Sequence, residues 1–201
     1  MFEILLTFFV LSFLLLVASI IWRINARKYI SSGTVASAYD AWTEDKLLER
    51  LWGEHIHLGF YPSGKTNIDF RNAKVHFVHT LVKWSGLDKL PKGSRILDVG
   101  CGIGGSSRIL AKYYGFNVTG ITISPAQVKR ARELTPFGLN CNFQVMDALD
   151  LKFEDGSFDA VWSVEAGAHM NDKTKFADEM LRTLRPGGYL ALADWNSRDL
   201  R

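Results

Sequence analysis

The sequence has few cysteines and little net charge. Its two cysteines, Cys101 and Cys141, predict no disulfide framework, and both are expected to be small packing residues. The net charge is only +3, and most of this excess comes from three basic residues and one acidic residue among the first thirty. Because the rest of the chain is nearly neutral, it lacks the basic surface that nucleic-acid binding requires.

The sequence also lacks a convincing set of metal ligands. His55 and His57 form one close pair, and His76 and His79 form another. Neither pair has an evident third ligand of the kind that a metal site needs. We therefore expect no metal.

Charged residues are absent from residues 4–22. As a helix, this stretch would be about 28 Å long, close to the roughly 30 Å of hydrocarbon in a bilayer. The basic residues Arg23, Arg27 and Lys28 follow the apolar stretch, whereas in a signal peptide they would precede it. We therefore expect residues 1–30 to be an uncleaved single-pass membrane anchor, with the following domain in the cytoplasm. A cleaved signal peptide and a buried soluble helix are the alternatives.

The rest of the chain divides into a helical segment, residues 31–90, and an alternating segment, residues 91–201. Helices are predicted over 35–52, 67–85, 106–114, 125–134 and 172–184, and strands over 95–100, 117–122, 142–147, 158–164 and 187–195. Strands that are separated by helices predict an α/β fold with a parallel sheet and helices on both faces. The helix over 67–85 is expected to bury an apolar stripe that includes Phe70 and Trp84.

The most informative segment is RILDVGCGIGGSS, residues 95–107. It predicts a buried strand, a glycine-rich turn and a helix start, an order that brings bare backbone against a ligand. Gly100, Gly102 and Gly105 match the dinucleotide pattern G-x-G-x-x-G, but no acidic residue ends the next strand to bind a ribose. Asp98 instead suits a cationic amino group, such as that of S-adenosylmethionine. An ordinary strand-to-helix turn is the alternative.

Other candidate residues follow the later strands, where parallel sheets bind their ligands. Asp147 is placed to accept a hydrogen bond from an adenine amino group, with a role as a loop cap as the alternative. Thr122 occupies the position of the missing acidic residue. Ribose binding is thus left to weaker groups such as Gln127, whose alternative role is to cap the helix that begins near Ser124.

Several motifs resemble those of a known family. DVGCGIGGSS, the PGG turn and the five ordered strands are similar to class I S-adenosylmethionine-dependent methyltransferases. More narrowly, AYDAWTED, WGEHIHLGFY, GITISPAQVKRA and VWSVEAGAHMNDK resemble the tocopherol and plastoquinone methyltransferase group. The resemblance covers residues 31–199. It implies that residues 31–90 form a helical lid on the substrate side and that residues 91–201 form a cofactor-binding domain that is incomplete at its C-terminal end. It also implies a Rossmann-like sheet, S-adenosylmethionine as cofactor, and C-methylation of a prenylated benzoquinol with a phytyl or solanesyl chain.

The resemblance and the strand ends together assign roles to particular residues. His169 and Glu165 are the candidate bases for the phenol proton, with His169 preferred, although a histidine that is satisfied by backbone hydrogen bonds is the alternative. The prenyl tail of the substrate would partition into the membrane lipid that residues 4–22 are expected to enter. The expected cofactor-binding residues are Tyr39, Asp98, Gly100, Cys101, Gly102, Ile103, Gly104, Thr122, Ile123, Gln127, Asp147 and Ala148.

The number of strands is smaller than the resemblance implies. A class I methyltransferase completes seven strands, and five are counted here, so we expect the last strands to be missing and this chain alone to have weak or no turnover. The alternative functions are a γ-tocopherol or sterol C-methyltransferase, and a non-catalytic, membrane-tethered module that binds the cofactor.

Overall fold

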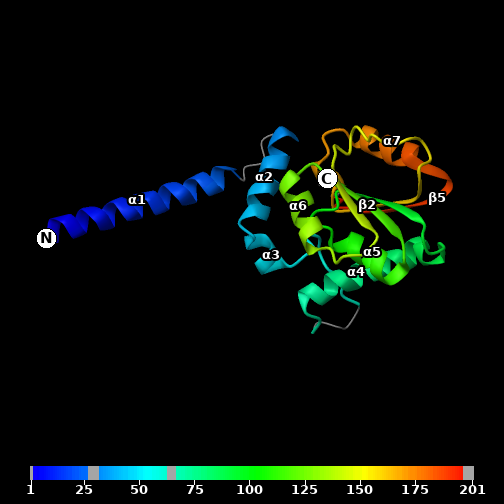
Figure 1. The fold of residues 1–201 in the computed structure, drawn as a ribbon, viewed down its shortest axis with the longest axis horizontal. Coiled ribbons are helices and arrows are strands. Elements are labelled where there is room, and N and C mark those ends of the chain that lie inside the picture. The colour runs from blue at the N-terminus through cyan, green and yellow to red at the C-terminus, as the bar shows by residue number, and fades with distance from the viewer. Residues whose placement is uncertain (1, 27–31, 63–66, 197–201) are drawn as a thin grey trace, which may run out of the picture.

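A computed structural model describes residues 2–26, 32–62 and 67–196 of the chain. Its centre is a five-stranded sheet with the order β3-β2-β1-β4-β5 (Figure 1). All four neighbouring pairs are parallel, which confirms the predicted α/β class with a parallel sheet. The strands are β1 (Arg95–Val99), β2 (Asn117–Thr122), β3 (Cys141–Val145), β4 (Phe158–Val164) and β5 (Leu184–Ala193).

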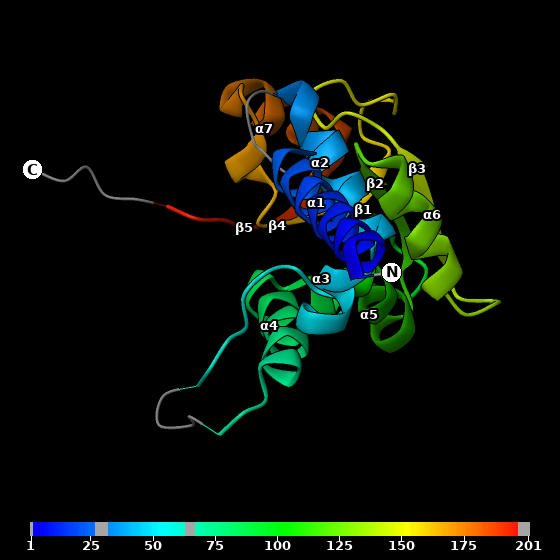
Figure 2. The ribbon, with the colours of Figure 1, turned by 90° about the vertical axis from the view of Figure 1, so that its left-hand side faces the viewer.

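Helices cover both faces of the sheet, as predicted. Figure 1 shows α7 above the strands and α4 and α5 below them, and Figure 2 shows the same two layers from the side. The α-helices are α1 (Phe2–Ala26), α2 (Ser32–Glu44), α3 (Leu47–Trp52), α4 (Phe70–Ser85), α5 (Gly105–Tyr114), α6 (Pro125–Leu134) and α7 (Lys173–Thr183). Two short 3-10 helices, η1 (Leu87–Lys89) and η2 (Gly167–His169), complete the set in the described residues.

The core has two main parts, one on each face of the sheet. On one face, Ile96 of β1 packs with Val82 of α4 and Leu110 of α5. On the other face, Leu97 of β1 packs with Met180 of α7. Successive side chains of a strand point to opposite faces, so a strand that is covered on both sides is apolar throughout. This packing holds the carboxyl ends of the strands, and the loops that follow them, in a defined position.

The helical segment before the sheet differs from the prediction in two places. The single helix predicted over 35–52 is wrong, because Lys46 adopts a left-handed backbone with φ 53° and separates α2 from α3. Asp45 Oδ1 accepts a hydrogen bond from the Leu47 amide at 2.9 Å and so starts the second helix. The apolar stripe predicted on α4 is wrong at its two ends, since Phe70 and Trp84 are 36% and 75% exposed, whereas Ala73 and Leu81 between them are buried. Lys74, which lies outside the stripe, is also buried.

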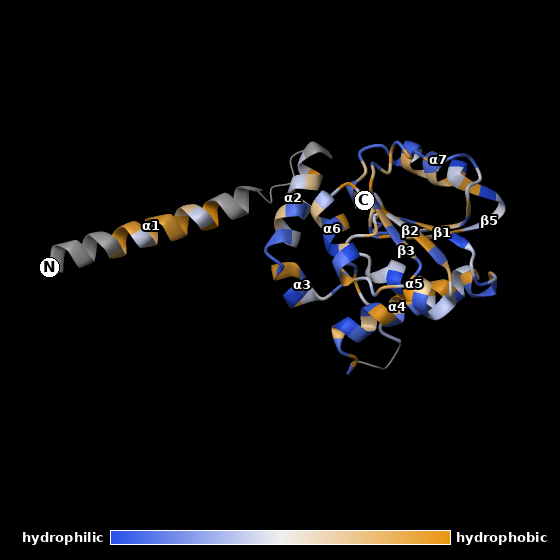
Figure 3. Cartoon of the chain, viewed as in Figure 1, coloured by the Kyte–Doolittle hydropathy of each residue, from blue (hydrophilic) through white to orange (hydrophobic). Residues whose placement is uncertain are grey.

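The first helix, α1, extends away from the sheet (Figure 1). Side chains within it are described for residues 9–21, and Figure 3 shows that this stretch is largely hydrophobic. Among the described residues, no helix has the length and hydropathy needed to cross a membrane, so the expected membrane span over residues 4–22 is not supported. Two residues of the expected basic flank, Arg27 and Lys28, lie outside the described residues.

Candidate active site

A cavity of about 310 Å³ lies at the carboxyl ends of the strands, where ligands bind in parallel sheets. Its walls come from the loops after β1, β2, β3 and β4, from α2, and from residues 54–57. The predicted site residues that line it are Tyr39, Asp98, Gly100, Cys101, Gly102, Ile103, Thr122, Ile123, Gln127, Asp147, Ala148, Glu165 and His169. The structure therefore brings together residues that are spread over 130 positions of the chain.

Three glycines of the turn after β1 adopt a left-handed backbone conformation. Gly100, Gly102 and Gly104 have φ angles of 78°, 56° and 81°, which residues with a Cβ rarely adopt. The Gly100 and Cys101 amides both donate to the Ile121 carbonyl at 2.9 Å, so the turn is bonded to the end of β2. Gly104 does not line the cavity. It precedes α5, and a Cβ there would lie 2.6 Å from the Phe143 ring.

Two alanine substitutions in this turn should have different effects on stability. A Cβ at Gly100 would overlap the Cβ of Ala166, whereas a Cβ at Gly102 would meet nothing within 4 Å. We expect Gly102→Ala to lower the free energy of unfolding by about 1 kcal/mol, through backbone strain alone. Gly100→Ala should lower it by about 3 kcal/mol, because overpacking adds to the strain. Urea denaturation of both variants measures the difference, and equal losses would contradict the close contact.

Asp98 is the most deeply buried acidic side chain of the cavity wall. It is 2% exposed, and its Oδ2 accepts a hydrogen bond from Ser107 Oγ at 2.5 Å. Burial raises the pKa of this carboxyl to about 7, while the bond from Ser107 opposes that rise. A buried carboxylate is costly unless a cation pairs with it. The site thus favours a ligand with a positively charged group at this point.

Thr122 and Gln127 form a bonded pair on the wall after β2. The hydroxyl of Thr122 donates to Gln127 Oε1 at 2.7 Å, and Ser124 Oγ accepts from the Gln127 amide at 3.1 Å. Ser124 therefore caps α6, as predicted, but the Gln127 side chain contacts Thr122 instead of completing a capping box. Both side chains are buried and offer polar groups at one place in the cavity.

An acidic residue that the sequence analysis missed joins α2 to this wall. Asp40 Oδ1 accepts hydrogen bonds from Ser124 Oγ at 2.5 Å and from the Ala126 amide at 3.1 Å. A carboxylate at a helix N-terminus is stabilised by the free amides and by the helix dipole. Asp40 thus attaches α2 to α6, and the adjacent Tyr39 faces the cavity.

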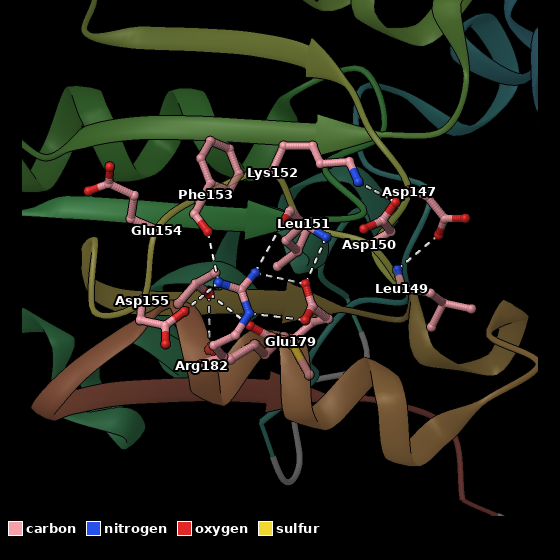
Figure 4. Close-up of polar contacts among 12 residues, drawn as sticks. Asp147, Leu149, Asp150, Leu151, Lys152, Phe153, Glu154, Asp155, Glu179 and Arg182 are labelled. Carbon is pink, nitrogen blue, oxygen red and sulfur yellow. Dashed lines mark hydrogen bonds and ion pairs between the residues drawn. The ribbon is translucent and has the colours of Figure 1, made fainter.

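Hydrogen bonds hold the loop after β3 at both of its ends. Asp147 Oδ1 accepts from the Leu149 amide at 2.9 Å, so it makes the loop-capping bond that was the alternative to adenine binding, and it also lines the cavity. Figure 4 shows how Arg182 and Glu179 of α7 hold the rest of this loop. Arg182 donates to the Leu151 carbonyl at 2.9 Å and Glu179 accepts from the Leu151 amide at 2.8 Å. These contacts connect the cavity wall to α7.

The two candidate bases after β4 have different partners. His169 Nε2 lies 2.9 Å from the Tyr39 hydroxyl, and burial lowers the pKa of the imidazole. Glu165 has a left-handed backbone, φ 52°, and its Oε1 accepts from the Leu58 amide at 3.1 Å. Strained backbone of this kind concentrates at functional sites. Each side chain therefore connects the sheet to a different part of the helical segment.

Comparison with known proteins identifies the central part of the chain. Residues 97–192 match a family described as a methyltransferase domain. These residues belong to the methyltransferase domain family. The chain is 60% identical over 191 residues to the 2-methyl-6-phytyl-1,4-hydroquinone methyltransferase of Synechocystis sp., covering 95% of this chain and 60% of that protein. It is 42% identical to the chloroplastic tocopherol O-methyltransferase of Arabidopsis thaliana, covering 77% of this chain and 47% of that protein.

Solved structures share the fold of this methyltransferase domain and the helices before it. The [4+2]-cyclase SpnF superposes with a TM-score of 0.72 at 30% identity, covering 80% of this chain and 59% of that one. A putative sarcosine dimethylglycine methyltransferase from Galdieria sulphuraria superposes with a TM-score of 0.68 at 30% identity, covering 76% and 58%. The chain spans 60% or less of the length of its first relatives.

The segment before the methyltransferase domain contributes three polar cavity residues that the sequence analysis did not assign to the site. Glu54, His55 and His57 line the cavity, although the two histidines were considered only as metal ligands. In the described part of the chain, no group of three or more potential ligands could hold a metal ion. The signal that could have found these residues is their position in WGEHIHLGFY, one of the motifs that resembled the family.

Proposed function

We propose that this chain belongs to an enzyme that transfers a methyl group from S-adenosylmethionine to a ring carbon of a prenylated benzoquinol. The proposed substrate is a 2-methyl-6-phytyl- or solanesyl-benzoquinol, as in tocopherol and plastoquinone biosynthesis. The observation that carries the proposal is the 60% identity, over 95% of this chain, to a protein named for methylation of 2-methyl-6-phytyl-1,4-hydroquinone.

The cavity walls fit S-adenosylmethionine. Bound there, the cofactor supplies an electrophilic methyl group on a cationic sulfonium. Asp98, a buried carboxyl that accepts a hydrogen bond from Ser107, would hold its amino group. The bonded pair Thr122 and Gln127 would contact the ribose, and Asp147 the adenine. The left-handed glycines would let backbone amides approach the ligand without a Cβ in between.

The same cavity offers a base for the phenol proton of the quinol. Loss of that proton makes the adjacent ring carbon more nucleophilic. His169 suits this role because its lowered pKa keeps the imidazole neutral near pH 7, and a neutral imidazole accepts a proton. Tyr39 contacts the same nitrogen, so its hydroxyl either moves aside or relays the proton. Since Glu165 is bonded to the Leu58 amide, we assign it the role of holding residues 57–58 against the sheet.

A labelled-methyl assay on the purified protein tests the proposal. S-adenosylmethionine with a labelled methyl group would be incubated with 2-methyl-6-phytyl-benzoquinol, its solanesyl counterpart, γ-tocopherol and a sterol. We expect label in the two benzoquinols at a ring carbon, at a low level because weak turnover is expected of this chain alone. The chain spans only part of its relatives, so the Synechocystis relative, assayed in the same way, is the positive control. Label only in γ-tocopherol or the sterol, or in none of the four, would contradict the proposed substrate.

We further propose that residues 4–22 attach the enzyme to membrane lipid, with the methyltransferase domain on the cytoplasmic side. Phe9 and Leu15 of α1 are 73% and 72% exposed, and exposed apolar side chains of this size favour a lipid surface. A prenyl tail partitions into the bilayer, so attachment would raise the encounter rate between enzyme and substrate.

Deletion of residues 1–28 tests this attachment. We expect unchanged affinity for S-adenosylhomocysteine, because the cavity is lined by residues from 35 onward. Turnover of phytyl-benzoquinol in liposomes should fall about tenfold or more, as the local concentration at the membrane is lost. A short-chain, water-soluble quinol is the control and should be methylated equally by both proteins. Equal turnover on liposomes would contradict the attachment.

A further inference from the structure

Two histidines before the methyltransferase domain form a directed chain of hydrogen bonds. His57 Nδ1 lies 2.7 Å from the Leu58 carbonyl oxygen. Since a carbonyl oxygen only accepts, Nδ1 carries the hydrogen. Burial lowers the pKa of His57, so its ring is neutral and its Nε2 is an acceptor. His55 Nδ1 lies 3.2 Å from that Nε2 and therefore donates to it.

This chain of bonds determines the chemistry of the second nitrogen of His55. Burial, followed by repulsion from the cations Arg108 and Lys74, lowers the pKa of His55 to about 3. The ring is thus neutral, its Nδ1 carries the only hydrogen, and its Nε2 presents a lone pair. Among the described residues, Nε2 of His55 has no recorded hydrogen-bond partner, and His55 is part of the cavity wall.

The position of the His55 ring is set by its surroundings. Lys74 Nζ donates to the carbonyls of His55 and Trp52, each at 2.8 Å, and so holds the backbone of this segment. The ring lies against the first residue of α5, because a Cβ on Gly105 would be 2.8 Å from His55 Cε1. Ser107, two residues further along α5, is the residue that donates to Asp98. His55 therefore stands beside the start of α5, on the wall of the same cavity that Asp98 lines.

We infer that His55 Nε2 accepts a hydrogen bond from the ammonium group of the amino-acid end of S-adenosylmethionine and shares that group with Asp98. This inference rests on the proposed function. An ammonium has three hydrogens to donate, and one carboxyl that also accepts from Ser107 does not satisfy them all. A neutral acceptor suits the second place, because a second carboxylate would repel Asp98 at close range. A carboxylate of the ligand does not fit His55, since Nε2 has no hydrogen to donate.

Calorimetry with two nucleosides tests this role. S-adenosylhomocysteine carries the ammonium group, and 5′-methylthioadenosine lacks the amino-acid end but keeps the adenosine. We expect His55→Ala to weaken the binding of S-adenosylhomocysteine about tenfold or more, since hydrogen bonds to charged groups are the strong ones. Its binding of 5′-methylthioadenosine should stay within twofold of wild type. The control is His76→Ala, which removes an exposed histidine of α4 that does not line the cavity.

Two other outcomes for His55→Ala would overturn the inference. An equal loss of affinity for both nucleosides would show that His55 only supports the cavity wall. Unchanged affinity for both nucleosides, with a raised KM for the quinol, would assign His55 Nε2 to a phenol hydroxyl. If the wild-type protein binds neither nucleoside, the proposed cofactor fails as well, which separates that failure from one confined to His55.

Nitrogen-15 NMR of the histidine rings tests the chain of bonds by itself. We expect both His55 and His57 to be neutral at pH 7 and to carry the hydrogen on Nδ1. In His57→Asn, the side-chain amide can still donate to the Leu58 carbonyl, but the acceptor for His55 is lost. His55 should then no longer favour the Nδ1 tautomer, and affinity for S-adenosylhomocysteine should fall. A hydrogen on Nε2 of His55 in the wild-type protein would overturn the inference.

Discussion

Asp98→Asn should weaken the binding of S-adenosylhomocysteine about a hundredfold or more while the protein stays folded. The substitution keeps the size and shape of the side chain and a polar partner for Ser107, but it removes the negative charge. Breaking a buried ion pair by neutralising one partner costs about 3–5 kcal/mol, because the other charge is left uncompensated. Calorimetry measures the loss, and Asp178→Asn, at an exposed position of α7, is the control. Binding at the wild-type level would disprove the role of Asp98.

The same residue should make cofactor binding depend on pH. The pKa of Asp98 is raised to about 7 by burial, so below pH 7 the carboxyl of the free protein is protonated and must lose its proton to pair with a cation. Affinity should therefore fall roughly tenfold for each pH unit below 7 and level off above it. Asp98→Asn should remove this dependence. A wild-type affinity that is constant between pH 5.5 and 7.5 would contradict the raised pKa.

The raised pKa of Asp98 should also make the folding stability of the ligand-free protein depend on pH. The pKa of Asp98 in the folded protein, about 7, lies above the ordinary aspartate value of 3.8, so between these two pH values the folded state binds more protons than the unfolded state. This carboxyl therefore lowers the stability of the ligand-free protein as pH rises from about 4 to 7. Urea denaturation across this range, with Asp98→Asn as the reference, isolates its contribution.

His169→Ala should lower kcat about a hundredfold without changing the affinity for S-adenosylhomocysteine. A positioned general base contributes about 10²–10⁴ in rate, and removing it leaves the alignment of the reactants in place. Tyr39→Phe should also lower kcat, because the hydroxyl that contacts His169 Nε2 at 2.9 Å is lost. If the two residues act as one unit, the double variant should be no slower than His169→Ala alone.

The pH dependence of turnover distinguishes a base from a structural histidine. Burial lowers the pKa of His169 below the ordinary histidine value of 6.5. The acidic limb of the kcat profile should therefore lie below pH 6.5 and vanish in His169→Ala. His79→Ala is the control, because His79 bonds Tyr114 and does not line the cavity. A variant that loses rate but keeps the limb would assign the proton transfer to another group.

Much of the site could be predicted from the sequence, because it depends on the pattern of neighbouring residues and on the rule that parallel strands end at one edge of the sheet. The strand that contains Asp98, the glycine turn and the helix after it were all recognisable from neighbouring residues. Parallel strands end at the same edge of a sheet, so Thr122, Asp147 and His169 were expected near that turn, and all of them line the cavity.

Most of the wrong or missed predictions concern residues whose position depends on contacts between distant segments of the chain. The break at Lys46 is a local exception, where Asp45 starts a new helix at Leu47. Lys74, in contrast, is buried because two distant carbonyls accept its hydrogens. Asp40 was missed because it caps a helix 86 positions further along the chain. No periodicity in the sequence reports such partners.

The order of strands and helices, and the places where bare backbone is needed, were determined by the sequence alone, since hydrophobic periodicity and glycine conformation act over a few residues. Beyond Tyr39, only the tertiary structure decided which side chains of the helical segment line or support the cavity. The His55 ring lies against Gly105, and Asp40 accepts a hydrogen bond from Ser124. Long-range geometry of this kind is set by the packing of the whole core.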